Sequence, residues 1–256
     1  PMRAAELEGR AGKQPDGSAR TREVKLVTVW TAEGRDAEGI PVRDSGSVSY
    51  SAAIESAASR DTDDAPSEFA RRAEREAQRR GFDVAARRVV LGDGALWIWN
   101  LAGEQFPDAV EIVDLFHAKQ HLSDVAKAIY GPAVDLGRQW ARQRHDELDE
   151  GRLDTLLAAL RIRAGANDEA RKCLDYITRN RDRMRYPEFR AQGLCVSSGV
   201  VEAGCKVAIG TRLKRAGMHW TLAGADAIIA LRCCKLSGRF EGFWERRSAG
   251  VAGAAG

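Results

Sequence analysis

The sequence lacks any apolar run that approaches the ~20 residues of a membrane-spanning helix, and its first residues do not resemble a secretory signal. Its five cysteines are an odd number without Cys-x-x-Cys spacing, which argues against a zinc or disulfide framework. Internal repeats are also missing. These absences exclude membrane-spanning proteins and small disulfide-stapled secreted domains. They predict a cytoplasmic protein with reduced cysteines in its core.

Charge is present in both signs but is unevenly distributed. The net charge of +3 is modest, and the 44% hydrophobic content of the 256 residues supports one large domain or one domain with an insertion. Between residues 203 and 239, however, seven Lys or Arg residues accompany a single acid, Asp226, and residues 161–190 hold nine basic residues against five acids. Such stretches predict a polyanion partner, or else a solvated basic helix face.

One apolar strand ends in an acid between two glycines. Residues 87–94 read Arg-Arg-Val-Val-Leu-Gly-Asp-Gly, so Asp93 follows a β-branched run with little bulk around it. This pattern also allows a simple Asp-Gly turn. Residues 95–105 predict a short helix, and residues 109–113 a second strand, closed by Asp114.

A strand, a helix and a strand in so few residues predict a βαβ unit with two parallel strands. Asp93 and Asp114 would then lie at the same carboxyl edge of the sheet, where ligands bind in open α/β sheets. Two acids at one edge repel each other unless a cation or a shared proton intervenes. The pattern therefore favours a metal ion.

The flanking segments predict further strands and helices. Residues 23–30 and 47–54 alternate as two antiparallel strands, and Ser67 is expected to cap a helix that runs to Arg80, whose Arg and Glu side chains face water. Residues 118–185 are helical in pattern, with breaks near Gly131, Gly151 and Gly165. Tyr186-Pro187 is expected to open a loop.

A later helix, opening at residues 197–206, carries an acid on its expected apolar stripe. Glu202 shares that stripe with Cys205, Ile209 and Leu213. It is either a first-turn acid that the helix dipole favours, or a carboxylate held inward for a metal ion. Thr221 is expected to cap the next helix, which reaches Ser237.

Several segments, in order, resemble one family. Residues 92–100 (Gly-Asp-Gly-Ala-Leu-Trp-Ile-Trp-Asn) and 112–122 (Ile-Val-Asp-Leu-Phe-His-Ala-Lys-Gln-His-Leu) resemble the DDE transposases of bacterial insertion sequences in the Mutator-like superfamily. So do residues 198–206 (Ser-Gly-Val-Val-Glu-Ala-Gly-Cys-Lys), 218–220 (Met-His-Trp) and 230–236 (Ala-Leu-Arg-Cys-Cys-Lys-Leu). The resemblance covers nearly the whole chain.

The resemblance implies an α/β fold: an RNase H-like mixed sheet flanked by helices, with an all-α insertion before the helix of the catalytic glutamate. Residues 1–117 would form the first part of the core and 118–190 the insertion. Residues 191–245 would form the C-terminal core helices, and 246–256 a disordered tail. The first acid of the family's triad is expected upstream of Pro1, because no Asp before residue 23 has a strand-like approach.

The resemblance also implies roles for single residues. Asp93 corresponds to the second acid of the triad and Glu202 to the third, and Asp114 and His117 form the Asp-x-x-His signature between them. Asp93 and Glu202 would bind Mg²⁺ or Mn²⁺. Two such ions ~3.5–4 Å apart can clamp the attacking and leaving oxygens of a phosphoryl displacement. A lone structural histidine is the other interpretation of His117. With His121, four residues on, it makes only a weak zinc signal.

The implied partner is double-stranded DNA, at the element ends and at the target, bound by a homo-oligomer. Lys206, Arg212, Lys214 and Arg215 follow Glu202 and would contact phosphates. The protein would then be cytoplasmic in a bacterium, nucleoid-associated when bound, and inactive alone for want of the first acid. Two alternatives stay open: a non-catalytic DNA-binding or assembly fragment of a transposase, and another RNase H-like nuclease.

Overall fold

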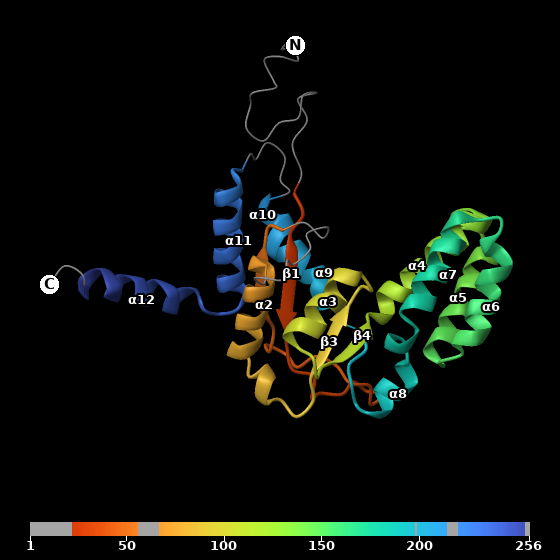
Figure 1. The fold of residues 1–256 in the computed structure, drawn as a ribbon, viewed down its shortest axis with the longest axis horizontal. Helices are drawn as coiled ribbons and strands as arrows, with labels where there is room; N and C mark the ends of the chain where they lie inside the picture. Colours follow the sequence, from red (N-terminus) through yellow and green to blue (C-terminus); the bar gives the residue numbers. More distant parts are fainter. Residues whose placement is uncertain (1–21, 56–66, 198, 214–219, 254–256) are drawn as a thin grey trace, which may run out of the picture. The chain divides into compact units, whose positions relative to one another are not determined.

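The computed structural model describes residues 22–55, 67–197, 199–213 and 220–253. It is an α/β structure (Figure 1). Its residues divide into two compact units. Unit 1 comprises the described residues up to Thr31, residues 45–84 and those from Val200 onward. Unit 2 comprises residues 32–44 and 85–199. The predicted α/β class is confirmed.

Unit 1 is a two-stranded antiparallel sheet covered by helices. Strands β1 (Lys25–Val29) and β2 (Ser49–Ala53) pair with Lys25 opposite Ala53, as the alternating pattern predicts. Helices α2 (Glu68–Arg79) and α11 (Leu222–Leu236) both pack on β2. The buried centre of this unit consists of Ala52, Ala208, Ile209, Ile229 and Cys233. The other elements of the unit are η1 (Phe82–Val84), α9 (Val200–Gly204), the π-helix η3 (Cys205–Gly210), α10 (Thr211–Leu213) and α12 (Phe240–Gly253).

Helix α2 begins and ends as its sequence predicts, but one of its polar residues is buried. The Ser67 hydroxyl accepts a hydrogen bond from the backbone N–H of Ala70, and Gly81 adopts a φ of +68° after the last turn. The expectation that every Glu of this helix faces water is wrong for Glu76, which is 1% exposed. Its carboxylate can be buried because Arg239 donates to both oxygens, each at 2.8 Å.

Unit 2 contains the predicted βαβ unit. Strands β3 (Val89–Gly92) and β4 (Val110–Val113) are parallel and are joined by α3 (Leu96–Gln105). Five helices follow: α4 (Leu115–Tyr130), α5 (Asp135–Asp149), α6 (Leu153–Ala164), α7 (Asp168–Arg179) and α8 (Tyr186–Ala191), with the short η2 (Arg181–Arg183) before α8. One apolar cluster runs from Ile112 and Val113 of β4 to Leu156 and Leu160 of α6. The helices therefore share a core with the strands.

The helix breaks in unit 2 are where the sequence predicts them, with one exception. Gly131 and Gly151 adopt φ values of +88° and +73° between successive helices. The loop expected from Tyr186 is wrong, because Tyr186 begins α8. Pro187 lies in the first turn of that helix, where a missing N–H breaks no intrahelical hydrogen bond.

The structure has the expected mixture of helices and strands, but the expected RNase H-like sheet is not confirmed. Among the described residues the four strands form two separate two-stranded sheets, and no ladder joins β2 to β3 or β4. Each sheet instead buries its apolar face against helices of its own unit. The units also cut across the expected boundaries, since residues 118–190 belong with β3 and β4.

The C-terminal segment differs from its expectation as well. Helix α12 continues to Gly253, so residues 246–253 are helical where a disordered tail was expected, and 254–256 lie outside the described residues. The alanines of this segment favour helix. Among the described helices, none has the length and apolarity needed to cross a membrane.

Candidate active site at the ends of β3 and β4

The parallel register brings the two strand-end acids to one edge of the sheet. Gly92 pairs with Val113, so Asp93 and Asp114 each follow the last paired residue of a strand. The N–H of Asp114 donates to the carbonyl oxygen of Gly92 at 2.7 Å. Asp93 is exposed and Asp114 half-buried. The predicted neighbourhood of these two acids is confirmed.

Asp93 is held by its own turn. Its Oδ1 accepts a hydrogen bond from the N–H of Ala95 at 2.9 Å, and the residue is exposed. Gly94 has a φ of +93°, and a Cβ there would lie 2.4 Å from Cε2 of Tyr176. Both the backbone angle and the close approach of Tyr176 require glycine at position 94. The turn interpretation of Asp93-Gly94 is therefore confirmed, and the role of Asp93 as a metal ligand stays a prediction.

Asp114 caps the helix that follows it. Its Oδ1 accepts hydrogen bonds from the N–H groups of Phe116, at 2.9 Å, and His117, at 3.2 Å. The N–H groups in the first turn of α4 have no partner within the helix, and the Asp114 carboxylate accepts hydrogen bonds from them. The cap fixes where α4 begins and therefore where His117 lies.

His117 lies beside two aromatic residues, His121 and Tyr176. The Nε2 atoms of His117 and His121 are 3.2 Å apart. The ring of Tyr176, from α7, lies 4.4 Å from that of His121 between centroids. Burial, followed by the proximity of His117, lowers the pKa of His121. All three side chains are half-buried.

Two residues of this site carry no signal in the sequence. The Tyr176 hydroxyl donates to the main-chain oxygen of Asp93 at 2.8 Å. Burial, and then the nearby Asp93, raise the pKa of Tyr176, so the phenol keeps its proton. Asn180, one turn later and 1% exposed, accepts a hydrogen bond from the Trp99 indole at 3.0 Å and donates to the Tyr176 carbonyl at 3.1 Å. Both residues lie more than 80 positions after Asp93 in the sequence, so no local sequence pattern connects them to the site.

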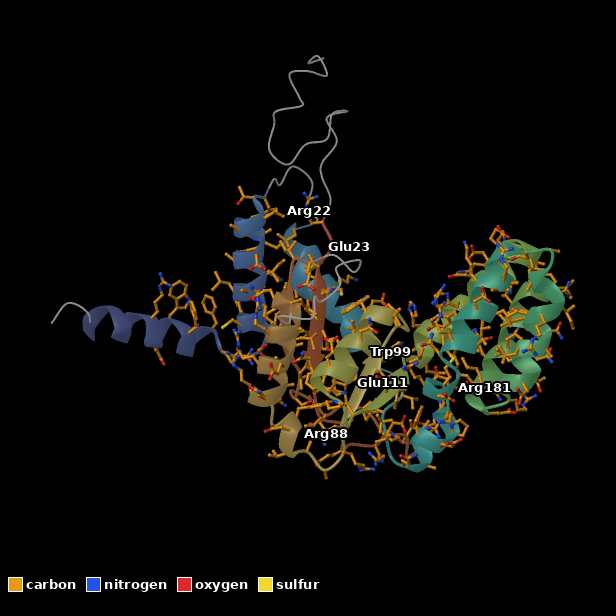
Figure 2. All side chains as sticks on the ribbon, viewed as in Figure 1. Arg22, Glu23, Arg88, Trp99, Glu111 and Arg181 are labelled. Atoms are coloured by element: carbon orange, nitrogen blue, oxygen red, sulfur yellow. The ribbon has the colours of Figure 1, made fainter. Side chains whose placement is uncertain are left out.

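Trp99 itself belongs to the core. It is 7% exposed, and the guanidinium of Arg183 lies 4.8 Å from its ring centroid. Arg183 also pairs with Glu111 of β4 at 2.5 Å; Trp99 and Glu111 are labelled in Figure 2. These contacts tie η2 to the βαβ unit from the side of α3 and β4.

Glu202 belongs to unit 1 and is not inward-facing. It lies in the first turn of α9 and is exposed, whereas the buried positions of this segment are Val200, Gly204, Ala208 and Ile209. The buried residues follow one another at intervals of four from Val200, and Glu202 lies between them, on the exposed side of the helix. The π-helix Cys205–Gly210 then shifts the phase, so the expected stripe through Cys205 is wrong. Its partnership with Asp93 stays a prediction.

The basic residues after Glu202 are partly described. Lys206 and Arg212 are exposed, and Lys214 and Arg215 lie outside the described residues. In the described part, no group of three or more His, Cys, Asp or Glu side chains is placed to hold a metal ion. The donor chemistry of Asp93 and Glu202, two exposed carboxylates, still suits Mg²⁺, which keeps several waters and takes few protein oxygens.

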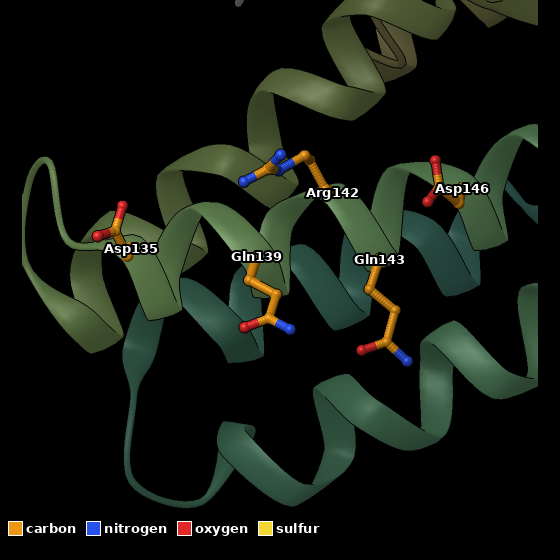
Figure 3. A pocket seen from close by; sticks show the side chains of 5 residues that line it. All are labelled: Asp135, Gln139, Arg142, Gln143 and Asp146. Carbon is orange, nitrogen blue, oxygen red and sulfur yellow. The ribbon is translucent and has the colours of Figure 1, made fainter.

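A shallow polar groove lies elsewhere, along α5. It is lined by Asp135, Gln139, Arg142, Gln143 and Asp146, which project from successive turns of this one helix (Figure 3). None of the strand-end residues lines it, and side chains from a single helix do not converge on a ligand from several directions.

Comparison of the chain with protein-family models, curated proteins and solved structures finds no match. A family assignment therefore rests on the motifs and on the geometry of the strand-end acids.

Proposed function

We propose that this chain is the catalytic domain of a DDE transposase of bacterial insertion sequences, of the Mutator-like superfamily, with an RNase H-like core. The observation that carries the proposal is the parallel pairing of β3 and β4, which puts Asp93 and Asp114 at one carboxyl edge. That edge is where α/β sheets bind ligands. The exposed carboxylate of Asp93, and the Asp114 side chain that caps α4 at His117, support the proposal.

In this proposal the carboxylates of Asp93 and Glu202 bind Mg²⁺ or Mn²⁺. The bound ions supply charge neutralisation and an activated oxygen nucleophile for phosphodiester hydrolysis and strand transfer. The chain's own residues orient the carboxylate: the Ala95 N–H fixes Oδ1 of Asp93, and the Tyr176 hydroxyl fixes its main-chain carbonyl. Asp114 positions His117 by capping α4.

Double-stranded DNA is the proposed substrate, at the element ends and at the target, with a homo-oligomer assembled on it. Lys206 and Arg212, both exposed in unit 1 near Glu202 in sequence, would contact phosphates. Such contacts position DNA without reading its sequence.

The test is strand transfer by the full-length protein, with Mg²⁺ or Mn²⁺ and DNA carrying the element ends. Asp93→Asn and Glu202→Gln should each lower activity by at least about 100-fold, because a metal-holding carboxylate contributes several kcal/mol. Asp108→Asn is the control for the first change, since Asp108 is 74% exposed and pairs with Arg88. Glu241→Gln, an exposed acid in the first turn of α12, is the control for the second.

The alternatives give different results in the same assay. A non-catalytic assembly fragment would bind the element ends without strand transfer, so Asp93→Asn and Glu202→Gln would change no activity. Another RNase H-like nuclease would cleave branched DNA in preference to element ends and would join no ends to a target. Either outcome would remove the transposase assignment.

A further inference from the structure

The two histidines of α4 form a close pair outside the proposed Mg²⁺ positions. His117 and His121 are one helical turn apart, so their side chains lie on the same face. Their Nε2 atoms are 3.2 Å apart, and the two rings meet edge to face at 88°. Both residues are half-buried.

We propose that His117 and His121 form a two-imidazole site for one first-row transition-metal ion of the Zn²⁺ class. A tetrahedral ion bound at ~2.0–2.1 Å by two imidazole nitrogens holds them about 3.3 Å apart. The observed separation, at which the two rings are within hydrogen-bonding distance of each other, is close to that of a chelating pair. Histidine χ2 is broad, so the rings can turn to aim both lone pairs at a common ion.

The surroundings favour a cation at this place and hold one ring still. Asp124, Asp93 and Glu169 act on His121 in the direction that favours positive charge. The Tyr176 ring lies against His121 at 4.4 Å, which limits its motion.

The remaining coordination positions would be filled by water or by an oxygen of a bound ligand, since the described residues supply no third His, Cys, Asp or Glu to this group. An open site of this kind differs from a closed structural zinc site. Nitrogen ligands also distinguish it from the Mg²⁺ positions proposed at Asp93 and Glu202, because Mg²⁺ prefers oxygen.

The experiment titrates Co²⁺, and then Zn²⁺ in competition, into the chain with excess Mg²⁺ and without DNA. We expect one equivalent of Co²⁺, visible absorption of a tetrahedral or five-coordinate ion without a thiolate charge-transfer band, and displacement by Zn²⁺. Nitrogen NMR of the imidazoles should show both His117 and His121 shifting on Zn²⁺ binding, which tests the site with no substitution.

His117→Ala and His121→Ala should each weaken binding by at least about tenfold, because even second-shell changes reach 10–100-fold. His121→Gln is a second variant that keeps a polar side chain against Tyr176. The matched control is His145→Gln, because the His145 ring is equally half-buried but its Nε2 lies 2.9 Å from the Lys119 carbonyl. That variant should bind metal as the unmodified chain does.

Three results would overturn the proposal: no saturable Co²⁺ binding, binding unchanged in both His117→Ala and His121→Ala, or a thiolate band that moves the site to a cysteine. The proposal does not rest on transposase chemistry. The titration contains no DNA, so a negative result there would say nothing about strand transfer. Conversely, Asp93→Asn protein that is inactive in strand transfer should still bind one Co²⁺.

Discussion

The hydroxyl of Tyr176 donates a hydrogen bond to the main-chain carbonyl of Asp93, at 2.8 Å, and so fastens α7 to the turn that presents the candidate catalytic carboxylate. The contact is between a helix of the predicted insertion and the end of β3. It makes the position of Asp93 depend on residues more than 80 positions away.

Tyr176→Phe removes this hydrogen bond while keeping the ring that packs against His121. The free energy of unfolding should fall by about 1 kcal/mol, the usual net contribution of one such bond. Amide exchange at Ala95, whose N–H bonds to Asp93, should accelerate because the turn loses its clamp. Tyr130→Phe is the comparison: its hydroxyl accepts from Arg163 at an exposed pair, and its loss should change neither quantity.

Gly94→Ala and Gly103→Ala should change the free energy of unfolding in opposite directions. At Gly94 the φ of +93° disfavours alanine, and the new Cβ would overlap the Tyr176 ring, so unfolding should become easier by about 1–3 kcal/mol. Gly103 lies within α3 with open space around it. Alanine there should stabilise the protein by about 0.5–1 kcal/mol. Urea unfolding measures both, and equal losses would contradict the role given to the Gly94 turn.

The βαβ unit was predictable because its information is local. Two apolar runs each end at an acid, and the ten residues of α3 between them leave room only for a parallel crossover. Helix α2 was predictable for the same reason, from Ser67 at one end and Gly81 at the other.

What the sequence could not show depends on long-range partners. Glu76 is buried because Arg239 reaches it across 163 residues, and Asn180 is buried because it satisfies the Trp99 indole. The buried face of the helix that carries Glu202 was predicted wrongly for another reason. The π-helix Cys205–Gly210 adds about one residue to each turn, whereas the prediction assumed 3.6 residues per turn throughout.

Asn180→Ala should be more destabilising than its size indicates. It leaves the Trp99 N–H buried without an acceptor and also frees the Tyr176 carbonyl. We expect a loss of about 2–4 kcal/mol, from one unsatisfied buried donor and the lost packing. Asn100→Ala, on the exposed side of α3, should stay within about 0.5 kcal/mol of the parent. A loss below 1 kcal/mol for Asn180→Ala would show that water replaces the amide.

At acidic pH the Lys25–Glu55 ion pair in unit 1 should no longer contribute to the free energy of unfolding. Burial raises the pKa of Glu55, but hydrogen bonds from Lys25, at 2.6 Å, and from the Phe69 N–H outweigh it and lower the pKa overall. A carboxylate with a lowered folded pKa stabilises the protein above its unfolded pKa of 4.5, and the stabilisation is lost as pH falls through the folded pKa. Glu55→Gln should therefore be less stable than the parent at pH 7 and no less stable in strong acid. Urea unfolding of both proteins across this range checks it, and a constant difference would refute it.

DNA binding should depend on salt through Lys206 and Arg212. Both are exposed and follow Glu202 in a segment with few acids, so each is expected to neutralise one phosphate and release one counterion. Lys206→Ala or Arg212→Ala should weaken binding about equally for all duplex sequences and reduce the slope of log K against log salt by about 1. Lys127→Ala is the control, because Lys127 is exposed but pairs with Asp124 at 2.8 Å on α4. Fluorescence anisotropy at several salt concentrations separates the two cases. If the slope were unchanged in both unit 1 variants, the basic residues after Glu202 would be a solvated helix face, and any DNA contact would have to come from another surface.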